Sequence, residues 1–129
     1  MPKSRAFAES LRKEHRRVRQ ELEHAGIMAG VLCEERPSRQ RKGMQMIGAL
    51  LDECVRAHAA WEDRVLAPVV GRRPDPEKDA LAGSIRKLVR EAGARLPDAQ
   101  AFGSRLNRVV GGLETHLQQE QRLLRIFGG

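Results

Sequence analysis

The sequence is poor in aromatic residues, with three Phe, one Trp and no Tyr among 129 residues. A hydrophobic core therefore has to be built from Leu, Val, Ile and Ala. Hydrophobic residues account for 40% of the chain and charged residues for 32%. This composition is typical of a soluble globular protein, and the length suits one domain. We expect residues 1–129 to form a single domain.

The sequence also lacks a long hydrophobic run. The longest stretch without a polar side chain extends from Ala25 to Cys33, whereas a membrane-spanning helix needs about 20 apolar residues. No apolar segment of the kind found in signal peptides follows Met1 to Arg5. We therefore expect a cytoplasmic protein without a membrane span, in which Cys33 and Cys54 stay reduced.

Positive charge exceeds negative charge, with a formal net charge of +7, but the excess is unevenly distributed. Residues 1–43 and 72–129 are basic, whereas residues 44–71 contain four acidic and two basic residues. A basic surface can attract nucleic acid or anionic lipid. Here the basic residues are mixed with acidic ones along helix faces, which is typical of a solvated surface. We therefore do not expect a nucleic-acid partner.

Four helical segments are predicted from apolar residues that recur every three or four positions. They extend from about residue 4 to 35, from 40 to 70, from 76 to 96, and from 98 to the glycines at 128 and 129. Pro37 ends the first segment, and Pro68 bends or ends the last turn of the second. Asp75 and Asp98 are suitable N-caps of the third and fourth. Because the connections are short, we expect an all-α fold, an antiparallel up-down-up-down four-helix bundle.

Two His-x-x-x-Glu pairs, His58 with Glu62 and His116 with Glu120, combine candidate metal ligands with helical spacing. Residues four positions apart lie on one face of a helix, one turn apart. Each pair is in line with the apolar residues of its segment, so both side chains are expected to point into the core. His15 has the same kind of position in the first segment. Buried charges of this kind must be paired or bound to a metal.

The three histidines are expected at one level of the bundle. His15 and His58 lie roughly 30 and 27 Å from the turn between their helices, at about 1.5 Å per residue. His116 lies 18 residues after Asp98, which places it at a similar height. One layer is therefore expected to gather His15, His58, Glu62, His116 and Glu120.

This set resembles the pattern of the hemerythrin-like (HHE) cation-binding family. That pattern has a His on helix one, His-x-x-x-Glu on helix two, a His on helix three and His-x-x-x-Glu on helix four. His15, within Lys-Glu-His-Arg-Arg, matches the first element, and the pairs that begin at His58 and His116 match the second and fourth. The proline that often follows the second pair in the family is also present, as Pro68. The resemblance covers nearly the whole chain.

The third helix departs from the family pattern. The place of the family's His, shortly before an Ile-Arg step, holds Ala82. Asp79, about one turn earlier, is the alternative candidate for a ligand from this helix. Five of the six family ligands are therefore present, and the number of metal ions stays open.

The resemblance implies a non-haem iron protein in which Glu62 and Glu120 bridge two irons. His15 and His58 would then hold one iron, and His116 the other. Zinc and manganese are alternatives, because imidazole and carboxylate suit all three metals. The implied function is the binding, sensing or storage of O2, NO or iron, rather than that of a dedicated enzyme.

Two other functions stay open on the sequence. The first is a degenerate, metal-free bundle in which His–Glu hydrogen bonds replace the metal and the basic surface binds a partner. The second is a histidine phosphotransfer bundle, which needs an exposed histidine and is disfavoured by the apolar context of His15, His58 and His116. His24 lies off the apolar stripe and is expected to be exposed. Cys54, one turn before His58, is expected to be a small core residue rather than a ligand.

Overall fold

The computed structural model of the chain describes residues 2–71, 76–92 and 98–127. Within these residues the regular secondary structure is entirely helical, as predicted. Four helices are long: α1 (Pro2–Leu32), α2 (Pro37–Trp61), α4 (Pro76–Glu91) and α5 (Ala99–Gln121). The short elements are the π-helical turn η1 (Glu62–Leu66), α3 (Ala67–Val70) and α6 (Leu123–Phe127).

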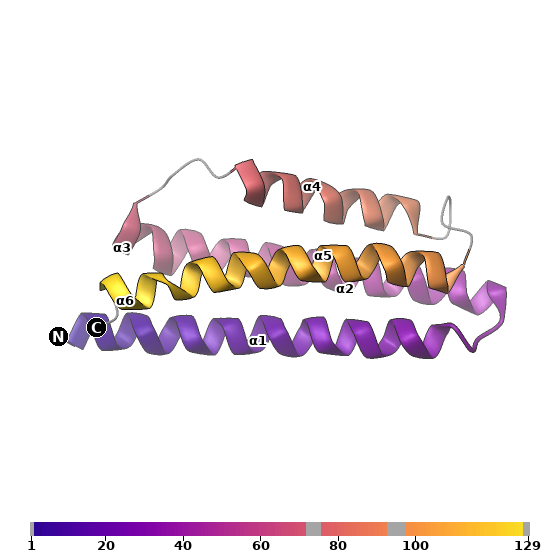
Figure 1. The fold of residues 1–129 in the computed structure, drawn as a ribbon, viewed down its shortest axis with the longest axis horizontal. Coiled ribbons are helices and arrows are strands. Elements are labelled where there is room, and N and C mark those ends of the chain that lie inside the picture. The colour runs from indigo at the N-terminus through magenta and orange to yellow at the C-terminus, as the bar shows by residue number, and fades with distance from the viewer. Residues whose placement is uncertain (1, 72–75, 93–97, 128–129) are drawn as a thin grey trace.

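The long helices lie alongside one another, along the long axis of the molecule (Figure 1). α1 contacts α2 and α5, and α4 also contacts α2 and α5. α6 contacts α1, so the beginning and the end of the described chain lie at the same end of the long axis (Figure 1). None of the helices in the described ranges is sufficiently long and apolar to cross a membrane.

The core is largely aliphatic and consists of two buried apolar clusters. The larger one is formed by residues of α1, α2, α4 and α5, beginning at Val18 on α1, and includes the fully buried Phe102. The smaller one contains Phe7, Leu11 and Trp61. His15 lies between the two clusters along α1, because Leu11 belongs to the smaller and Val18 to the larger. A polar layer therefore interrupts the apolar core.

The first turn between long helices differs from the prediction. α1 ends at Leu32 rather than near residue 35, and Pro37 is the first residue of α2 rather than the end of the preceding helix. Arg36, which precedes Pro37, has an extended backbone. Proline suits the first helical position because its backbone needs no hydrogen-bond donor there.

The second predicted helix is divided near Pro68. In η1 the backbone N–H of Ala67 donates to the carbonyl of Glu62, five residues earlier. Proline has no N–H, and its ring clashes with the carbonyl four residues before it in a regular α-helix. The wider turn accommodates Pro68, so the helical course continues to Val70. Such π-turns within helices are frequent at functional sites, and Glu62 begins this one.

The N-cap predicted for the fourth helix is confirmed, because Oδ1 of Asp98 accepts a hydrogen bond of 2.9 Å from the backbone N–H of Ala101. α5 then ends at Gln121, earlier than predicted, and α6 follows after Arg122. The predicted cap Asp75, the end of the third segment at residue 96, and the glycines at 128 and 129 lie outside the described residues.

Candidate metal centre

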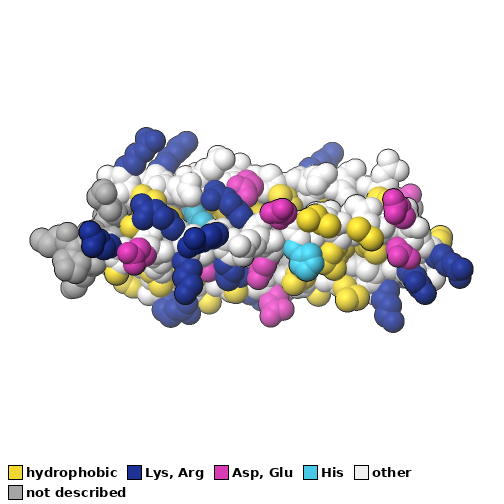
Figure 2. Space-filling model, turned by 90° about the horizontal axis from the view of Figure 1, so that it is seen from below, with side chains coloured by type: hydrophobic (Ala, Val, Ile, Leu, Met, Phe, Trp, Pro, Cys, Tyr) yellow, Lys and Arg dark blue, Asp and Glu magenta, His cyan; other side chains and the backbone are white. Residues whose placement is uncertain are grey.

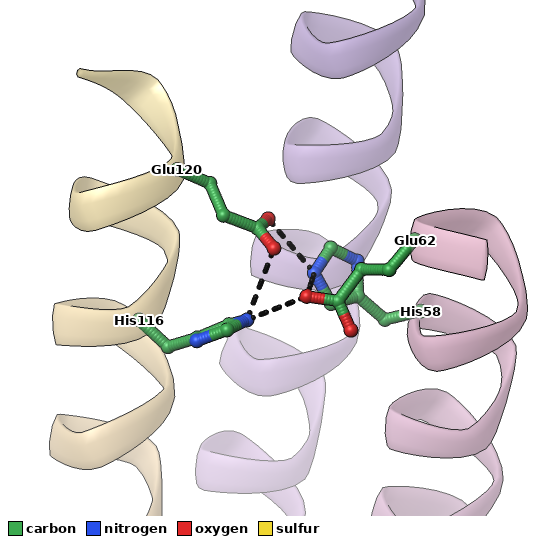
Figure 3. A group of neighbouring side chains, drawn as sticks. All are labelled: His58, Glu62, His116 and Glu120. Atoms are coloured by element: carbon green, nitrogen blue, oxygen red, sulfur yellow. Dashed lines mark hydrogen bonds and ion pairs between the residues drawn. The ribbon is translucent and has the colours of Figure 1, made fainter. Parts of the chain in front are cut away.

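Four of the predicted ligand residues form one compact cluster (Figure 3). His58 comes from α2 and Glu62 from the start of η1, while His116 and Glu120 come from α5. One potential ligand atom from each side chain lies within 4.8 Å of the other three. His116 is half-buried and the other three are buried. The cluster is therefore one that could hold a metal ion.

Most of the separations between donor atoms are close to those of a single coordination shell. Nε2 of His116 lies 2.9 Å from Oε2 of Glu62 and 3.1 Å from Oε2 of Glu120. Nε2 of His58 lies 3.0 Å from Oε1 of Glu120 and 3.8 Å from Oε2 of Glu62. Bonds of about 2.0–2.2 Å place neighbouring ligands roughly 3–3.5 Å apart around one ion. The donor set thus fits a metal ion without a large rearrangement.

His15 reaches the same layer from α1. Its Nε2 lies 2.8 Å from Oε1 of Glu120, and its side chain is only 1% exposed. Its Nδ1 is buried and has no hydrogen-bond partner within the described part of the chain. The structure therefore brings all five predicted side chains together, and their role as metal ligands stays a prediction.

Glu14 is a sixth polar residue of this layer, and the sequence analysis did not identify it. Its Oε2 accepts a hydrogen bond of 2.7 Å from Nδ1 of His58. Arg17 donates to both oxygens, from Nε to Oε1 at 2.9 Å and from Nη2 to Oε2 at 2.7 Å. Burial raises the pKa of Glu14, but the hydrogen bonds from Arg17 and His58 outweigh it, so the pKa is lowered. The i,i+3 spacing of Glu14 and Arg17 was readable in the sequence, but the contact with His58 was not.

Burial and hydrogen bonding act in opposite directions on the pKa values of the cluster. Burial lowers the pKa of His116, but hydrogen bonds to Glu120 and Glu62 outweigh it and raise the pKa to about 10. The pKa of His58 is raised in the same way, against its burial, mainly by Glu120. Burial raises the pKa of Glu120, but hydrogen bonds from His116, His15 and His58 lower it well below its usual range. The metal-free cluster therefore pairs imidazolium groups with carboxylates.

α4 presents a lysine to the cluster. Nζ of Lys78 lies 2.7 Å from Oε1 of Glu62. Asp79, the alternative ligand considered from the sequence, is exposed and does not belong to the cluster found among the described residues. Ala82 offers no polar atom. Lys78 lies four residues before Ala82, so both are on one face of α4, and this spacing was the signal in the sequence for a cation at the cluster.

A cavity of about 60 Å³ adjoins the cluster between α2, α4 and α5. His58, Glu62, Lys78 and His116 contribute to its wall, and most of the remaining wall is apolar, including Ala82. A water molecule occupies about 30 Å³ in the liquid. The cavity therefore has room for a diatomic molecule or one or two waters directly beside the donor atoms.

Two further residues near the cluster are explained by packing. Cys54 is buried in the large apolar cluster, and burial raises the pKa of its thiol to about 12, so it is a neutral core residue, as predicted. Trp61 stacks on the ring of His58, with ring centroids 5.6 Å apart and an interplanar angle of 13°. Its Nε1–H donates to Oγ of Ser10 at 3.0 Å. Trp61 therefore supports one face of the His58 ring.

His24 is exposed, as predicted.

The fold and the site thus define a helical protein with a buried His/Glu cluster that could hold a metal ion. Comparisons with protein-family models, with curated proteins and with solved structures found no match for this chain. The chemical interpretation of the cluster therefore depends on its own geometry and on the sequence pattern.

Proposed function

We propose that this chain is a hemerythrin-like metal-binding protein whose cluster holds a divalent ion, with iron as the first candidate and zinc or manganese as alternatives. The proposal depends on one observation, that donor atoms of two imidazoles and two carboxylates lie within 4.8 Å of one another in a largely buried layer. Imidazole and carboxylate are ligands of iron, zinc and manganese. The ligands are His58, Glu62, His116 and Glu120, with His15 as a fifth donor.

The proposed architecture is an antiparallel up-down-up-down bundle. The colours of Figure 1, which follow the chain from the N-terminus to the C-terminus, support it. They show that successive long helices run in alternating directions. The contacts of α1 and α4 with both α2 and α5 are those expected of neighbours in such a bundle. In this arrangement α1, α2 and α5 each contribute ligands at one level.

The proposed small ligand is O2 or NO, and the cavity beside the cluster supports it. A ferrous ion, when bound, supplies reversible binding of such diatomic molecules. The chain's own residues hold and orient the donors and exclude bulk water. Glu14 and Trp61 fix the ring of His58, and the apolar wall near Ala82 limits the space to about 60 Å³. The proposed role is binding, sensing or storage of the gas or of iron, rather than dedicated catalysis.

Metal content tests the proposal. After loading with Fe²⁺ under reducing conditions and removal of free metal, elemental analysis is expected to find about one equivalent or more per chain, since the donor atoms already lie together and the imidazolium groups release their protons when a metal binds. His24→Ala, at an exposed position of α1, is the matched control and should retain the metal. His58→Ala should lose most of it. Less than about a tenth of an equivalent in the unmodified protein would refute metal binding.

A metal-free interaction module is the second candidate, and one observation favours it. His–Glu hydrogen bonds and the Lys78–Glu62 ion pair already link the layer without a metal, although Nδ1 of His15 has no hydrogen-bond partner among the described residues. Lys and Arg side chains are most numerous over one half of the face in Figure 2, with Asp and Glu among them and further Lys and Arg at the opposite end, and would meet the partner. The same elemental analysis separates this candidate from the first.

A further inference from the structure

We propose that the centre holds one metal ion, and that the ammonium group of Lys78 takes the position on Glu62 that a second ion would need. This inference rests on the metal binding proposed above and specifies its stoichiometry. The family pattern implies two ions with Glu62 as a bridge. The two proposals therefore differ in the number of metal ions bound per chain.

The two oxygens of the Glu62 carboxylate face different groups. Its Oε2 faces the donor cluster, 2.9 Å from Nε2 of His116 and 3.8 Å from Nε2 of His58. Its Oε1 faces the other way, toward Nζ of Lys78 at 2.7 Å. A carboxylate that bridges two ions needs one oxygen for each ion. The contact is an ion pair without hydrogen-bond geometry, but the ammonium group occupies the space next to Oε1, so Glu62 offers only Oε2 to a metal while Lys78 lies there.

The charge of Lys78 also disfavours a second ion. A second ion on Oε1 would lie about 2.0–2.2 Å from that oxygen, in the space next to Nζ of Lys78. The repulsion between a divalent ion and an ammonium group at such a separation is large in a site that is mostly shielded from water. Glu62 is 7% exposed. One divalent ion balances the charges of Glu62 and Glu120, whereas a second would leave a large positive excess beside Lys78.

α4 supplies no ligand for a second ion. The residues that α4 presents to the cavity are Lys78, Leu81 and Ala82. The last two are apolar, and an ammonium group has no lone pair with which to bind a metal. A second ion would therefore depend on solvent for the side of its coordination shell that faces α4. The cavity beside these residues is then the place where an exogenous ligand would reach the single ion.

The stoichiometry is measured by titrating Mn²⁺ into the metal-free protein, with electron paramagnetic resonance and elemental analysis as readouts. The unmodified protein is expected to bind one equivalent, with the spectrum of an isolated ion. Lys78→Glu replaces the cation with a ligand and should raise the stoichiometry to two, with the spectral broadening of a pair about 3.5–4 Å apart. Lys87→Glu makes the same change of charge at an exposed position of α4 and should stay at one.

The outcomes distinguish failure of the proposed metal binding from failure of the one-ion inference. No bound metal in the unmodified protein refutes the proposed function itself. Two equivalents in the unmodified protein refute the inference and leave the proposed function standing. One equivalent in both the unmodified protein and folded Lys78→Glu refutes the role of Lys78. Lys78→His, which supplies an imidazole, replaces the glutamate variant if circular dichroism shows that the latter does not fold.

Discussion

Nδ1 of His58 lies 2.7 Å from Oε2 of Glu14, which joins the candidate centre to α1. Arg17 holds the same carboxylate with two hydrogen bonds, one of them to the oxygen that accepts from His58. Because Nδ1 donates to Glu14, Nε2 of His58 is directed at Glu120 and the other donors. Histidine ligands of metals usually have such a carboxylate or carbonyl on the second ring nitrogen, where it orients the ring and increases its basicity.

Glu14→Gln is expected to lower metal affinity by about 10-fold or more, because partners of this kind typically contribute 10–100-fold. Competition with a chromophoric chelator measures the affinity. Glu21→Gln is the matched control, since Glu21 also pairs with Arg17, at 3.2 Å, but does not contact His58. Equal affinities of Glu14→Gln and the unmodified protein would show that Glu14 only stabilises the fold.

Removal of the metal is expected to lower the melting temperature. An ion that binds the folded state alone adds about 2.7 kcal/mol of stability at a free concentration 100-fold above its Kd. The thermal transition is followed by circular dichroism in excess Zn²⁺ and after dialysis against a chelator, with the metal content of both samples measured. His116→Gln should show a smaller difference between the two states. An unchanged transition after proven metal loss would contradict a structural contribution of the ion.

The metal-free protein is expected to lose stability as the pH rises through the alkaline range. The ordinary pKa of His116, 6.5, is raised to about 10 in the folded state, because hydrogen bonds to Glu120 and Glu62 outweigh burial. A raised histidine pKa contributes stability that is fully present below pH 6.5 and is lost as the pH approaches 10. Urea unfolding at a series of pH values, with a chelator present, measures the change. In His116→Gln the decline over this range should be shallower, and equal slopes would exclude His116 as its cause.

Ala82→Leu is expected to fill the cavity and hinder the small ligand. The iron content should stay close to that of the unmodified protein, because Ala82 is not a ligand, while the affinity of the ferrous protein for NO should fall by about tenfold, or 1.4 kcal/mol. Absorption titration under anaerobic conditions measures it. Ala80→Leu adds the same side chain at an exposed position of α4 and serves as control. Unchanged NO affinity in Ala82→Leu would show that the ligand does not use this cavity.

Gly26→Ala and Gly30→Ala are each expected to stabilise the protein by about 0.5–1 kcal/mol, because glycine inside a helix loses more conformational freedom than alanine. Both lie within α1, and a Cβ atom added at either would meet nothing within 4 Å. Gly71 is the contrasting position, since its φ of 81° favours glycine. Gly71→Ala should therefore destabilise the protein. Denaturant unfolding measures all three, and a loss of stability in the α1 variants would indicate a packing role for those glycines.

Much of the local structure was predictable from the sequence, because helical periodicity and capping depend on neighbours along the chain. The all-helical fold, the buried positions of His15, His58, Glu62 and Glu120, and the cap at Asp98 all follow from side chains within a few residues. The turn before α2 was misassigned because a proline can either end a helix or begin one. Only the preceding backbone conformation distinguishes these two uses.

Contacts between helices depended on the tertiary structure. Periodicity tells which face of a helix is buried, but not the rotation and axial shift of one helix against another. Those two quantities bring Glu14 to His58 and Lys78 to Glu62, and they leave a cavity next to Ala82. The sequence alone therefore predicted five residues of the polar layer, but not Glu14. The packing of α1, α2, α4 and α5 decided which of them meet, since a hydrogen bond or ion pair forms only over a few ångströms.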